Sequence, residues 1–513
     1  MESAAVPAPS ATPRDTSAPG EKGLKAGALG YMSNLVIAVA STAPAYSLAT
    51  TLGFVAAVTG ITTHAPAILI VSFIPILFVS FGYRYFNLAD PDAGTTFAWV
   101  TRTFGPQIGW INGWAIVLAD VIVMASLADI ASTYTFELVG WTSASTSTLA
   151  ITIGSVVWIV LMTWICYRGI ELSARIQAAL LSLEILTLAV FAVVAFVDVY
   201  SSGAPTGAHH IALGWFNPFA LSTTELTGGV LLGIFIYWGW DSGVAVNEES
   251  ENPAEGPGRA AVLSTVLLVL IYVVVATAAQ ADAGTHFLVA NQNDVLSGLG
   301  QRVFGGGVLQ KLLLFSVLTS ASASTQTTIL PTARTTISMA SWGALPRAFA
   351  RVHPRFLTPS FSTLAMGAVS TIWTVGLLTL DTSGNVLGDS ITGLGFSICF
   401  YYGFTGLACA FYYRREIFKS VRRALLVGLV PLLGGAGMFF VFIKSYITSS
   451  KAGANYSAPF LGVQVPIVIG VGGLLLGVVF MAAQWIFMPD FFKRRTETAD
   501  PAILEAHLSH TAP

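Results

Sequence analysis

Apolar runs of roughly 20 residues recur along this 513-residue chain and constrain its fold more than any other feature. A helix of about that length crosses the roughly 30 Å of hydrocarbon in a lipid bilayer. Twelve such segments are predicted, at about residues 29–58, 63–83, 108–136, 147–166, 174–198, 224–245, 259–281, 308–340, 361–380, 388–413, 424–446 and 464–488. The sequence therefore predicts an all-α integral membrane protein with twelve transmembrane helices.

The composition agrees with a chain that is surrounded by lipid. Hydrophobic residues make up 54% of it and charged residues 10%, whereas a soluble domain carries about 25% charged residues. The net charge of −2 indicates no nucleic-acid partner. The three cysteines lie in apolar segments without metal-ligand spacing, so neither a metal nor another cofactor is expected.

Polar tails are predicted to flank the membrane domain. Residues 1–28 are rich in Pro, Ala, Ser and Thr and lack the apolar stretch of a signal peptide, which predicts a disordered, uncleaved tail. The membrane domain is predicted at 29–490, and a polar C-terminal tail at 491–513.

The lysines and arginines set the predicted orientation. Twenty of the 24 fall on the side of the twelve-segment topology that holds both tails, and four fall on the other side. Because positive residues favour the cytoplasmic face, both termini are predicted to be cytoplasmic in a multi-pass protein of the inner (cytoplasmic) membrane.

The first apolar segment is interrupted in its middle by Ser41-Thr42-Ala43-Pro44-Ala45-Tyr46. Proline removes a backbone donor and clashes with the carbonyl group four residues back. Within a membrane the freed carbonyl groups need partners, for which Ser41, Thr42, water or a ligand are the local candidates. Taken alone, the segment also fits a simple proline kink that its own hydroxyl groups satisfy.

The sixth segment carries glycines, aromatic rings and a carboxylate in the stretch Ile236-Tyr237-Trp238-Gly239-Trp240-Asp241-Ser242-Gly243. These residues suit an unwound backbone whose free N–H and C=O groups face a small polar solute. The first and sixth segments are matching members of two five-helix sets, at about 29–198 and 224–413, with two more helices at 424–488. Interruptions at corresponding positions of two halves indicate an inverted-repeat secondary transporter.

Three acidic residues lie well inside predicted segments: Asp120, Glu184 and Asp241. A charged side chain at the centre of a bilayer costs about 3 kcal/mol or more, so each of them is a candidate functional residue. No lysine or arginine lies deep within a predicted segment.

Several motifs occur in a fixed order along the chain. They include Pro91-Asp92-Ala93-Gly94-Thr95-Thr96-Phe97, Gly239-Trp240-Asp241, Glu248-Glu249-Ser250-Glu251-Asn252-Pro253 and Gly343-Ala344-Leu345-Pro346. Together they resemble the amino acid–polyamine–organocation (APC) permeases, of the bacterial amino-acid type, over roughly residues 25–445. The resemblance implies a LeuT-type fold with discontinuous helices 1 and 6, and a permease that moves amino acids by alternating access.

The first break departs from the commoner family pattern, which has glycines where this chain has Thr42-Ala43-Pro44. The proline keeps the break but changes which backbone amides are presented. The resemblance also puts Glu184 where some members carry a lysine whose protonation replaces a sodium ion, which implies coupling to H⁺. Two alternatives stay open: a neutral Glu184 that only bridges helices, and a Na⁺ site that Ser320 or Ser324 completes.

The predicted substrate site combines both breaks. The start of a half-helix favours a carboxylate, acids and free carbonyl groups favour an ammonium group, and aromatic rings supply cation–π faces. An amino acid satisfies all three, and a polyamine or another organic amine stays open. The predicted substrate-binding residues are Ser41, Thr42, Ala43, Pro44, Ala45, Tyr46, Asp120, Tyr237, Trp238, Gly239, Trp240 and Asp241; the predicted ion-coupling residues are Glu184, Ser320 and Ser324.

Other classes of function find little support. No catalytic motif occurs in the predicted segments, so no catalytic residue is predicted and the chain is not expected to be an enzyme. Glycines at Gly434-Gly435 and Gly473–Gly477 could pack against a second copy, so a homo-oligomer stays open.

Overall fold

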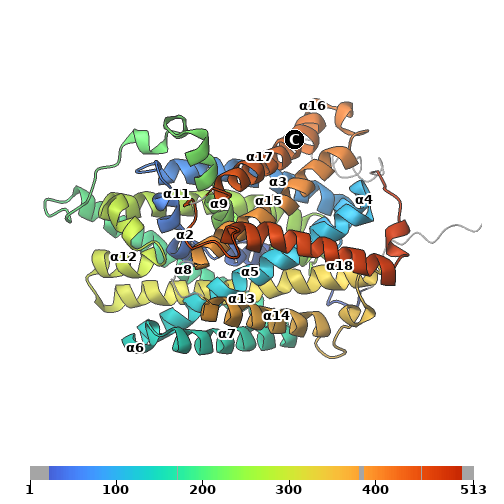
Figure 1. The fold of residues 1–513 in the computed structure, drawn as a ribbon, viewed down its shortest axis with the longest axis horizontal. Helices are drawn as coiled ribbons and strands as arrows, with labels where there is room; N and C mark the ends of the chain where they lie inside the picture. The colour runs from blue at the N-terminus through green and yellow to red at the C-terminus, as the bar shows by residue number, and fades with distance from the viewer. Residues whose placement is uncertain (1–21, 170, 381–385, 452, 499–513) are drawn as a thin grey trace, which may run out of the picture.

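The computed structural model describes residues 22–498 apart from 170, 381–385 and 452 (Figure 1). Over these residues it is helical and has no strand. Eleven helices are long and apolar enough to cross a membrane: Tyr31–Ala57, Ala65–Ala89, Pro106–Leu138, Thr148–Arg168, Arg175–Tyr200, Gly256–Ala290, Gly307–Ser341, Ser360–Thr379, Val386–Tyr412, Val421–Ser449 and Ile467–Phe487. Each of them coincides with a predicted segment.

The remaining predicted segment, 224–245, is divided. It forms α9 (Thr223–Tyr237) and the single turn α10 (Ser242–Ala245), and 15 residues are too few for α9 to be counted among the eleven. All twelve predicted segments therefore have helical counterparts, and the predicted all-α membrane fold with interrupted helices 1 and 6 is confirmed.

The long helices form two five-membered sets. The first set is α1 (Tyr31–Thr42) with α2 (Pro44–Ala57), α3 (Ala65–Ala89), α5 (Pro106–Leu138), α7 (Thr148–Arg168) and α8 (Glu171–Tyr200). The second set is α9 with α10, α11 (Gly256–Ala290), α13 (Gly307–Ser341), α14 (Ser360–Leu380) and α15 (Val386–Tyr412). The chain then adds α17 (Val430–Ser449) and α18 (Gly473–Phe487).

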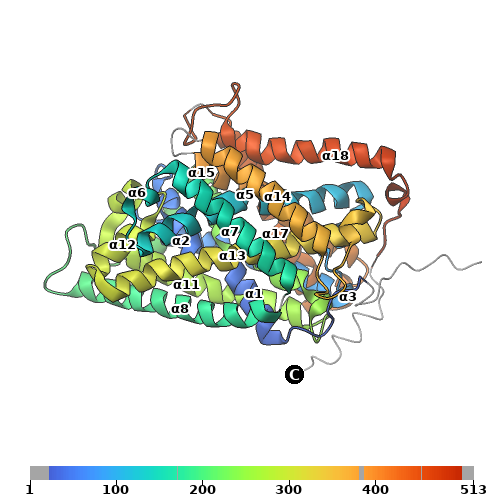
Figure 2. The ribbon, with the colours of Figure 1, turned by 90° about the horizontal axis from the view of Figure 1, so that it is seen from below.

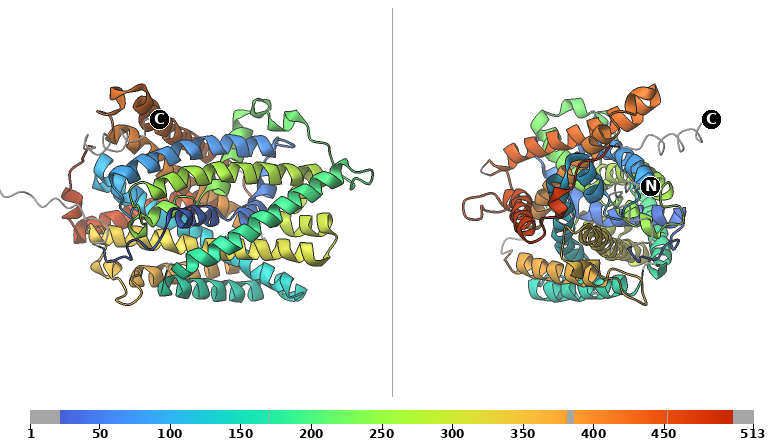
Figure 3. Two further views of the ribbon diagram at one scale, coloured as in Figure 1. Left: turned by 180° about the vertical axis from the view of Figure 1, so that it is seen from behind. Right: turned by 90° about the vertical axis from the view of Figure 1, so that its right-hand side faces the viewer.

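The two sets pack in matching pairs. Helix α3 packs on α11, α5 on α13 and α7 on α14, and the crossed pairs α8 with α13 and α15 with α5 also match. The short helices α4 (Thr96–Phe104) and α12 (Val295–Phe304) each precede and pack on the third member of their set. Figures 2 and 3 show α7 and α14 side by side and α18 at the edge of the bundle. Such pairing is expected of two structural repeats. The domain limits drawn from the sequence stay predictions.

The start of α9 shows how local sequence sets a helix end. Ser222 and Glu225 form a capping box, in which the Ser222 amide donates to Glu225 Oε2 over 2.7 Å and the Glu225 amide donates to Ser222 Oγ over 3.3 Å. Two amides that a helix start leaves without partners are satisfied in this way.

The ends of the described chain differ from the predicted tails. Residues 1–21 and 499–513 lie outside the described residues. Of the rest, Lys22 and Leu24 have buried side chains, and Phe491 and Phe492 are buried as well. Within the predicted tail 1–28, Lys22 and Leu24 thus contact the helix bundle through ionic and apolar contacts, and the extent of the tail stays a prediction.

Candidate functional site

The first interruption separates α1 from α2 at a single residue. Helix α1 ends at Thr42, Ala43 adopts the left-handed conformation with φ 47°, and Pro44 is the first residue of α2. Proline suits the first position of a helix because its missing N–H would have no partner there. Pro44 thus starts a new half-helix.

The carbonyl groups freed by this break receive donors from other helices. Ser324 Oγ of α13 donates to the Ser41 carbonyl over 2.9 Å. The Thr42 carbonyl accepts from Ser47 Oγ at 2.6 Å and from Tyr272 Oη of α11 at 3.3 Å. The hydroxyl groups of Ser41 and Thr42 alone therefore do not satisfy the free carbonyl groups. Hydrogen bonds from α11 and α13 connect these two helices to the break.

The free amides at the start of α2 are occupied by protein side chains. The Ala45 amide donates to Glu184 Oε1 over 2.7 Å, and the Tyr46 amide donates to Ser320 Oγ over 3.3 Å. Ser320 Oγ in turn donates to Glu184 Oε1 over 2.8 Å. Glu184 is 3% exposed, so a buried carboxyl group lies against the positive end of the half-helix dipole.

The second interruption lies directly opposite the first. Helix α9 ends at Tyr237, Trp238 is extended, and Gly239 has φ 112°. A Cβ atom on Gly239 would lie 2.7 Å from the Ser41 carbonyl oxygen. Ser41 Oγ and Ser242 Oγ are 2.8 Å apart in a hydrogen bond that joins the two breaks.

Replacing Gly239 with alanine is expected to abolish transport and to lower the thermal stability of the purified protein. The new Cβ would require both a left-handed backbone and a shift of the Ser41 carbonyl, and either change pushes the breaks apart. The matched control is Gly376→Ala in α14, where no atom lies within 4 Å of the added Cβ. Equal uptake and melting temperature for the two variants would contradict the close approach.

A small polar cavity lies between the breaks. Its lining residues are Ser41, Ile116, Asp120, Trp238, Gly239, Asp241, Ser242, Thr328, Pro331 and Tyr401. Its volume is ≈ 10 Å³, about the space that one water molecule needs. Five of the predicted substrate residues line it: Ser41, Asp120, Trp238, Gly239 and Asp241.

The other predicted substrate residues lie outside this lining. Tyr46 Oη donates to Ser126 Oγ over 2.7 Å. Tyr237 packs edge-on against Tyr272, and Trp240 packs against Tyr83 and Tyr402. Thr42, Ala43, Pro44 and Ala45 shape the backbone of the first break and are not among the lining residues.

Both acids of the cavity are held by hydroxyl groups. Asp241 accepts from Tyr402 Oη at 3.0 Å, Tyr401 Oη at 3.2 Å and Tyr83 Oη at 3.4 Å. Asp120 accepts a hydrogen bond from Thr332 Oγ1 of α13. No lysine or arginine is among the described residues that line the cavity, so its charged character is acidic.

The tyrosines around Asp241 were not predicted from the sequence. Tyr83 comes from α3, and Tyr401 and Tyr402 come from α15, more than 150 residues from Asp241. Trp238 Nε1 also donates to Tyr401 Oη, which ties the unwound stretch to α15. The sequence feature that could have indicated them is the pair of adjacent phenols, Tyr401-Tyr402, in the middle of an apolar segment.

A second polar cluster, the Lys22 cluster, was also missed. Lys22 Nζ lies 2.8 Å from Asp92 Oδ1 and 2.6 Å from Glu248 Oε1, and its side chain is 2% exposed. Ser338 Oγ of α13 donates to Asp92 Oδ1 over 2.6 Å. The segment before α1, the loop after α3, the segment after α10 and the end of α13 therefore meet at one ion-paired group.

The charges of the Lys22 cluster fix its pH range. Burial opposes the charge on Lys22, but Asp92 and Glu248 outweigh it and raise the pKa of Lys22 above its ordinary 10.5. Burial likewise opposes the charge on Asp92, yet Lys22 lowers the pKa of Asp92 below 3.8. The contribution of Lys22 is thus fully present below pH 10.5 and is lost as the pH rises above that value, whereas the contribution of Asp92 is fully present above pH 3.8 and is lost as the pH falls below it. Burial raises the pKa of Glu248 above its ordinary 4.5 despite the nearby Lys22, so Glu248 subtracts from the stabilisation as the pH rises above 4.5.

The Lys22→Met variant is expected to lose about 3–5 kcal/mol of stability, because two buried acids then face each other without a cation. The loss should appear as faster hydrogen exchange at the Leu29 amide, which donates to the Glu249 carbonyl over 3.0 Å. Lys311→Met, at an exposed position, is the control. Unchanged exchange in the Lys22 variant would show that the Lys22 cluster does not hold this segment.

In the described part of the chain, eleven helices that could cross a membrane, the divided segment α9–α10 and two facing interruptions around a small polar cavity are the features of a membrane transporter. Among the described residues, no group of three or more His, Cys, Asp or Glu side chains could hold a metal ion. The chain belongs to the amino acid permease family, whose family model matches residues 29–472. It is therefore a transporter and not an enzyme, as the sequence motifs indicated.

Similar proteins include several transporters. The mouse Asc-type amino acid transporter 1 is 25% identical over 427 residues, covering 81% of this chain and 74% of the relative. An uncharacterised transporter of Mycobacterium tuberculosis is 26% identical over 392 residues, covering 76% and 77%. The methylthioribose transporter of Bacillus subtilis is 22% identical over 402 residues, covering 75% and 82%.

Proposed function

We propose that this protein moves amino acids across the cytoplasmic membrane together with protons, and that Glu184 carries the proton. The observation that carries the proposal is the contact of the Glu184 carboxyl with the Ala45 amide and the Ser320 hydroxyl, deep within the membrane domain. In this proposal the break of helix 1 rearranges during transport, so a buried carboxyl that contacts it can gain and lose a proton there.

The substrate's ammonium group is proposed to bind between Asp120 and Asp241. Both acids line the central cavity, where no described residue supplies a positive charge. The aromatic ring of Trp238 lines the same space and offers a cation–π face. The names of two relatives, one an amino acid transporter and one a methylthioribose transporter, support a small polar solute.

The substrate's carboxylate is proposed to replace Glu184 and Ser320 as the acceptor of the hydrogen bonds that the Ala45 and Tyr46 amides donate. A half-helix start binds one carboxylate, and protonation weakens the hold of Glu184 on the Ala45 amide. Proton binding and substrate binding would then favour each other. The replacement of Glu184 by the substrate's carboxylate would couple proton binding to substrate binding without a further ion.

The cavity must enlarge to accept an amino acid, since it has room for about one water molecule. We propose that the sets of helices rock about the two breaks, which opens the cavity to each side of the membrane in turn. Cytoplasmic termini and a location in the inner membrane are part of this proposal, because of the distribution of lysine and arginine.

The test is counterflow and uptake by the purified protein in sodium-free proteoliposomes. The panel contains the 20 amino acids, putrescine as a diamine, and methylthioribose. The proposal requires uptake of at least one amino acid that an inward proton gradient drives and a protonophore abolishes. Uptake of the diamine alone would favour the organic-amine alternative.

A sodium-coupled mechanism is the second candidate. The hydroxyls of Ser320 and Ser324 lie against the first break, and Ser324 already contacts the Ser41 carbonyl. Hydroxyl and carbonyl oxygens are the ligands that a hard cation prefers. Uptake that requires external Na⁺ and ignores a protonophore would select this candidate.

A further inference from the structure

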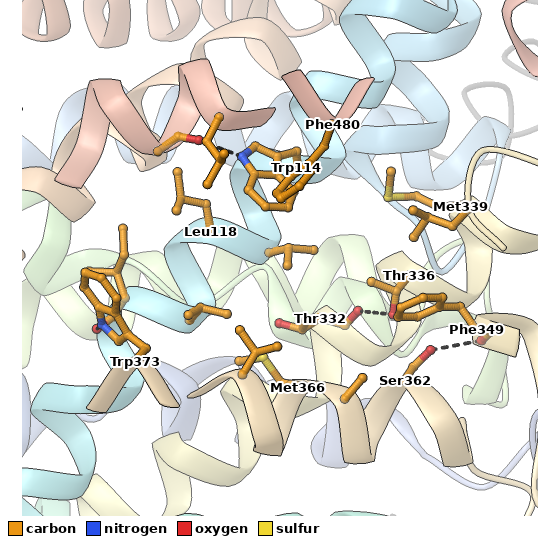
Figure 4. A pocket seen from close by; sticks show the side chains of 18 of the residues that line it. Trp114, Leu118, Thr332, Thr336, Met339, Phe349, Ser362, Met366, Trp373 and Phe480 are labelled. Carbon is orange, nitrogen blue, oxygen red and sulfur yellow. Dashed lines mark hydrogen bonds between the residues drawn. The ribbon is translucent and has the colours of Figure 1, made fainter. Parts of the chain in front are cut away.

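A second cavity of ≈ 930 Å³ lies between α5, α13, α14 and α18, apart from the polar site (Figure 4). Trp114, Leu118, Met366, Trp373 and Phe480 point into it in the close-up view. Nearly all of its lining is apolar. Water needs several polar partners, so a space of this size and character does not hold ordered water.

We propose that this cavity binds one acyl chain of a phospholipid, with the phosphate headgroup at Arg347. All four helices around it belong to membrane-spanning segments, so hydrocarbon chains are the surrounding medium. Several lining residues are open to that medium: Ile372 is 73% exposed, and Leu476 and Phe480 are 48% and 44% exposed. The cavity therefore opens sideways, toward the lipid.

The positive charge needed for a headgroup lies at one end. Pro346 and Phe349 line the cavity, and Arg347 stands between them in the short 3-10 helix Arg347–Ala350. Arg347 is exposed and takes part in no ion pair within the described part of the chain. An exposed guanidinium beside an apolar slot between membrane helices matches the phosphate and the acyl chain of one lipid molecule.

The apolar cavity lies close to the polar site at Thr332. Thr332 lines the apolar cavity, and its hydroxyl donates to Asp120, which lines the central cavity. Val121, next to Asp120 in α5, lines the apolar cavity as well. A bound acyl chain would thus contact α5 and α13 at the level of Asp120.

Native mass spectrometry of the delipidated full-length protein, reloaded with phosphatidylglycerol, tests the site. We expect one tightly held lipid per protein. Ala365→Phe and Ala483→Phe, on opposite walls, should each abolish it by filling the space. Leu364→Phe and Ala482→Phe are the matched controls, since these neighbouring residues are exposed, are not among the residues that line the cavity and should leave the lipid bound.

A separate experiment tests the contact between the lipid headgroup and Arg347. Arg347→Ala should weaken phosphatidylglycerol retention about fivefold and leave retention of diacylglycerol, which lacks the phosphate, unchanged. Arg415→Ala, at an exposed position after α15, is the charge control.

Loss of lipid from the controls as well as from the filling variants would overturn the site. A cavity occupied by a second copy of the chain would also overturn it, and would appear as a lipid-free dimer that Ala365→Phe dissociates. Because mass spectrometry reports binding without transport, these outcomes do not depend on the proposed coupling mechanism.

Discussion

Glu184→Gln is expected to abolish proton-driven uptake while substrate exchange continues. Glutamine has nearly the same shape, and its amide oxygen can still accept from the Ala45 amide and the Ser320 hydroxyl. The variant therefore keeps the contacts at the start of α2 but has no proton to exchange. Accumulation in proteoliposomes under an imposed pH gradient should fall to the level set by simple equilibration.

Two measurements keep this prediction sharp. Counterflow without a gradient should persist in Glu184→Gln, which shows that the variant is folded and binds substrate. Ser320→Ala serves as the control, because it removes one hydrogen bond to Glu184 and leaves the carboxyl in place. Full accumulation by Glu184→Gln under a pH gradient would exclude Glu184 as the proton carrier.

Arg334→Ala is expected to destabilise the protein by about 3–5 kcal/mol, the usual effect of removing one partner of a buried ion pair. Arg334 Nε and an Nη atom lie 2.7 and 2.9 Å from the two carboxylate oxygens of Glu249. Both residues are 1% exposed, so the variant leaves a buried carboxylate without its cation. Thermal unfolding of the detergent-solubilised protein measures the loss.

The exposed pair Arg259–Glu255 provides the control for Arg334→Ala. Its nitrogen and oxygen are 2.9 Å apart, but the side chains are 46% and 29% exposed. Arg259→Ala should therefore change stability by less than about 1 kcal/mol. The double variant Arg334→Ala/Glu249→Ala should recover part of the loss, because no unpaired charge remains. Additive losses would contradict a direct pair.

The sequence was sufficient to predict the membrane helices and the two breaks, because both depend on local composition. Apolar length determines a membrane span, and Pro44 and Gly239 mark points where a helix cannot continue unchanged. Glu184 could be singled out as a candidate functional residue because an acid in an apolar segment is rare.

Contacts between distant segments could not be predicted. Glu184 meets the Ala45 amide across 139 residues, and Lys22 meets Glu248 across 226. Neither pairing leaves a periodic trace in the sequence, since each depends on how whole helices pack. The same holds for Arg334, which lies in the predicted segment 308–340 and was counted only as a cytoplasmic-side charge, and which the structure buries against Glu249.

The hydrogen bonds at the start of α2 have a consequence for the proposed transport cycle. The amides of Ala45 and Tyr46 have partners within the protein, because they donate to Glu184 and Ser320. In the proposed mechanism, the Glu184 carboxyl thus occupies the place that the substrate's carboxylate takes. In the proposed mechanism, the carrier without substrate therefore changes orientation with these amides hydrogen-bonded, and only a substrate whose carboxylate displaces Glu184 is taken up.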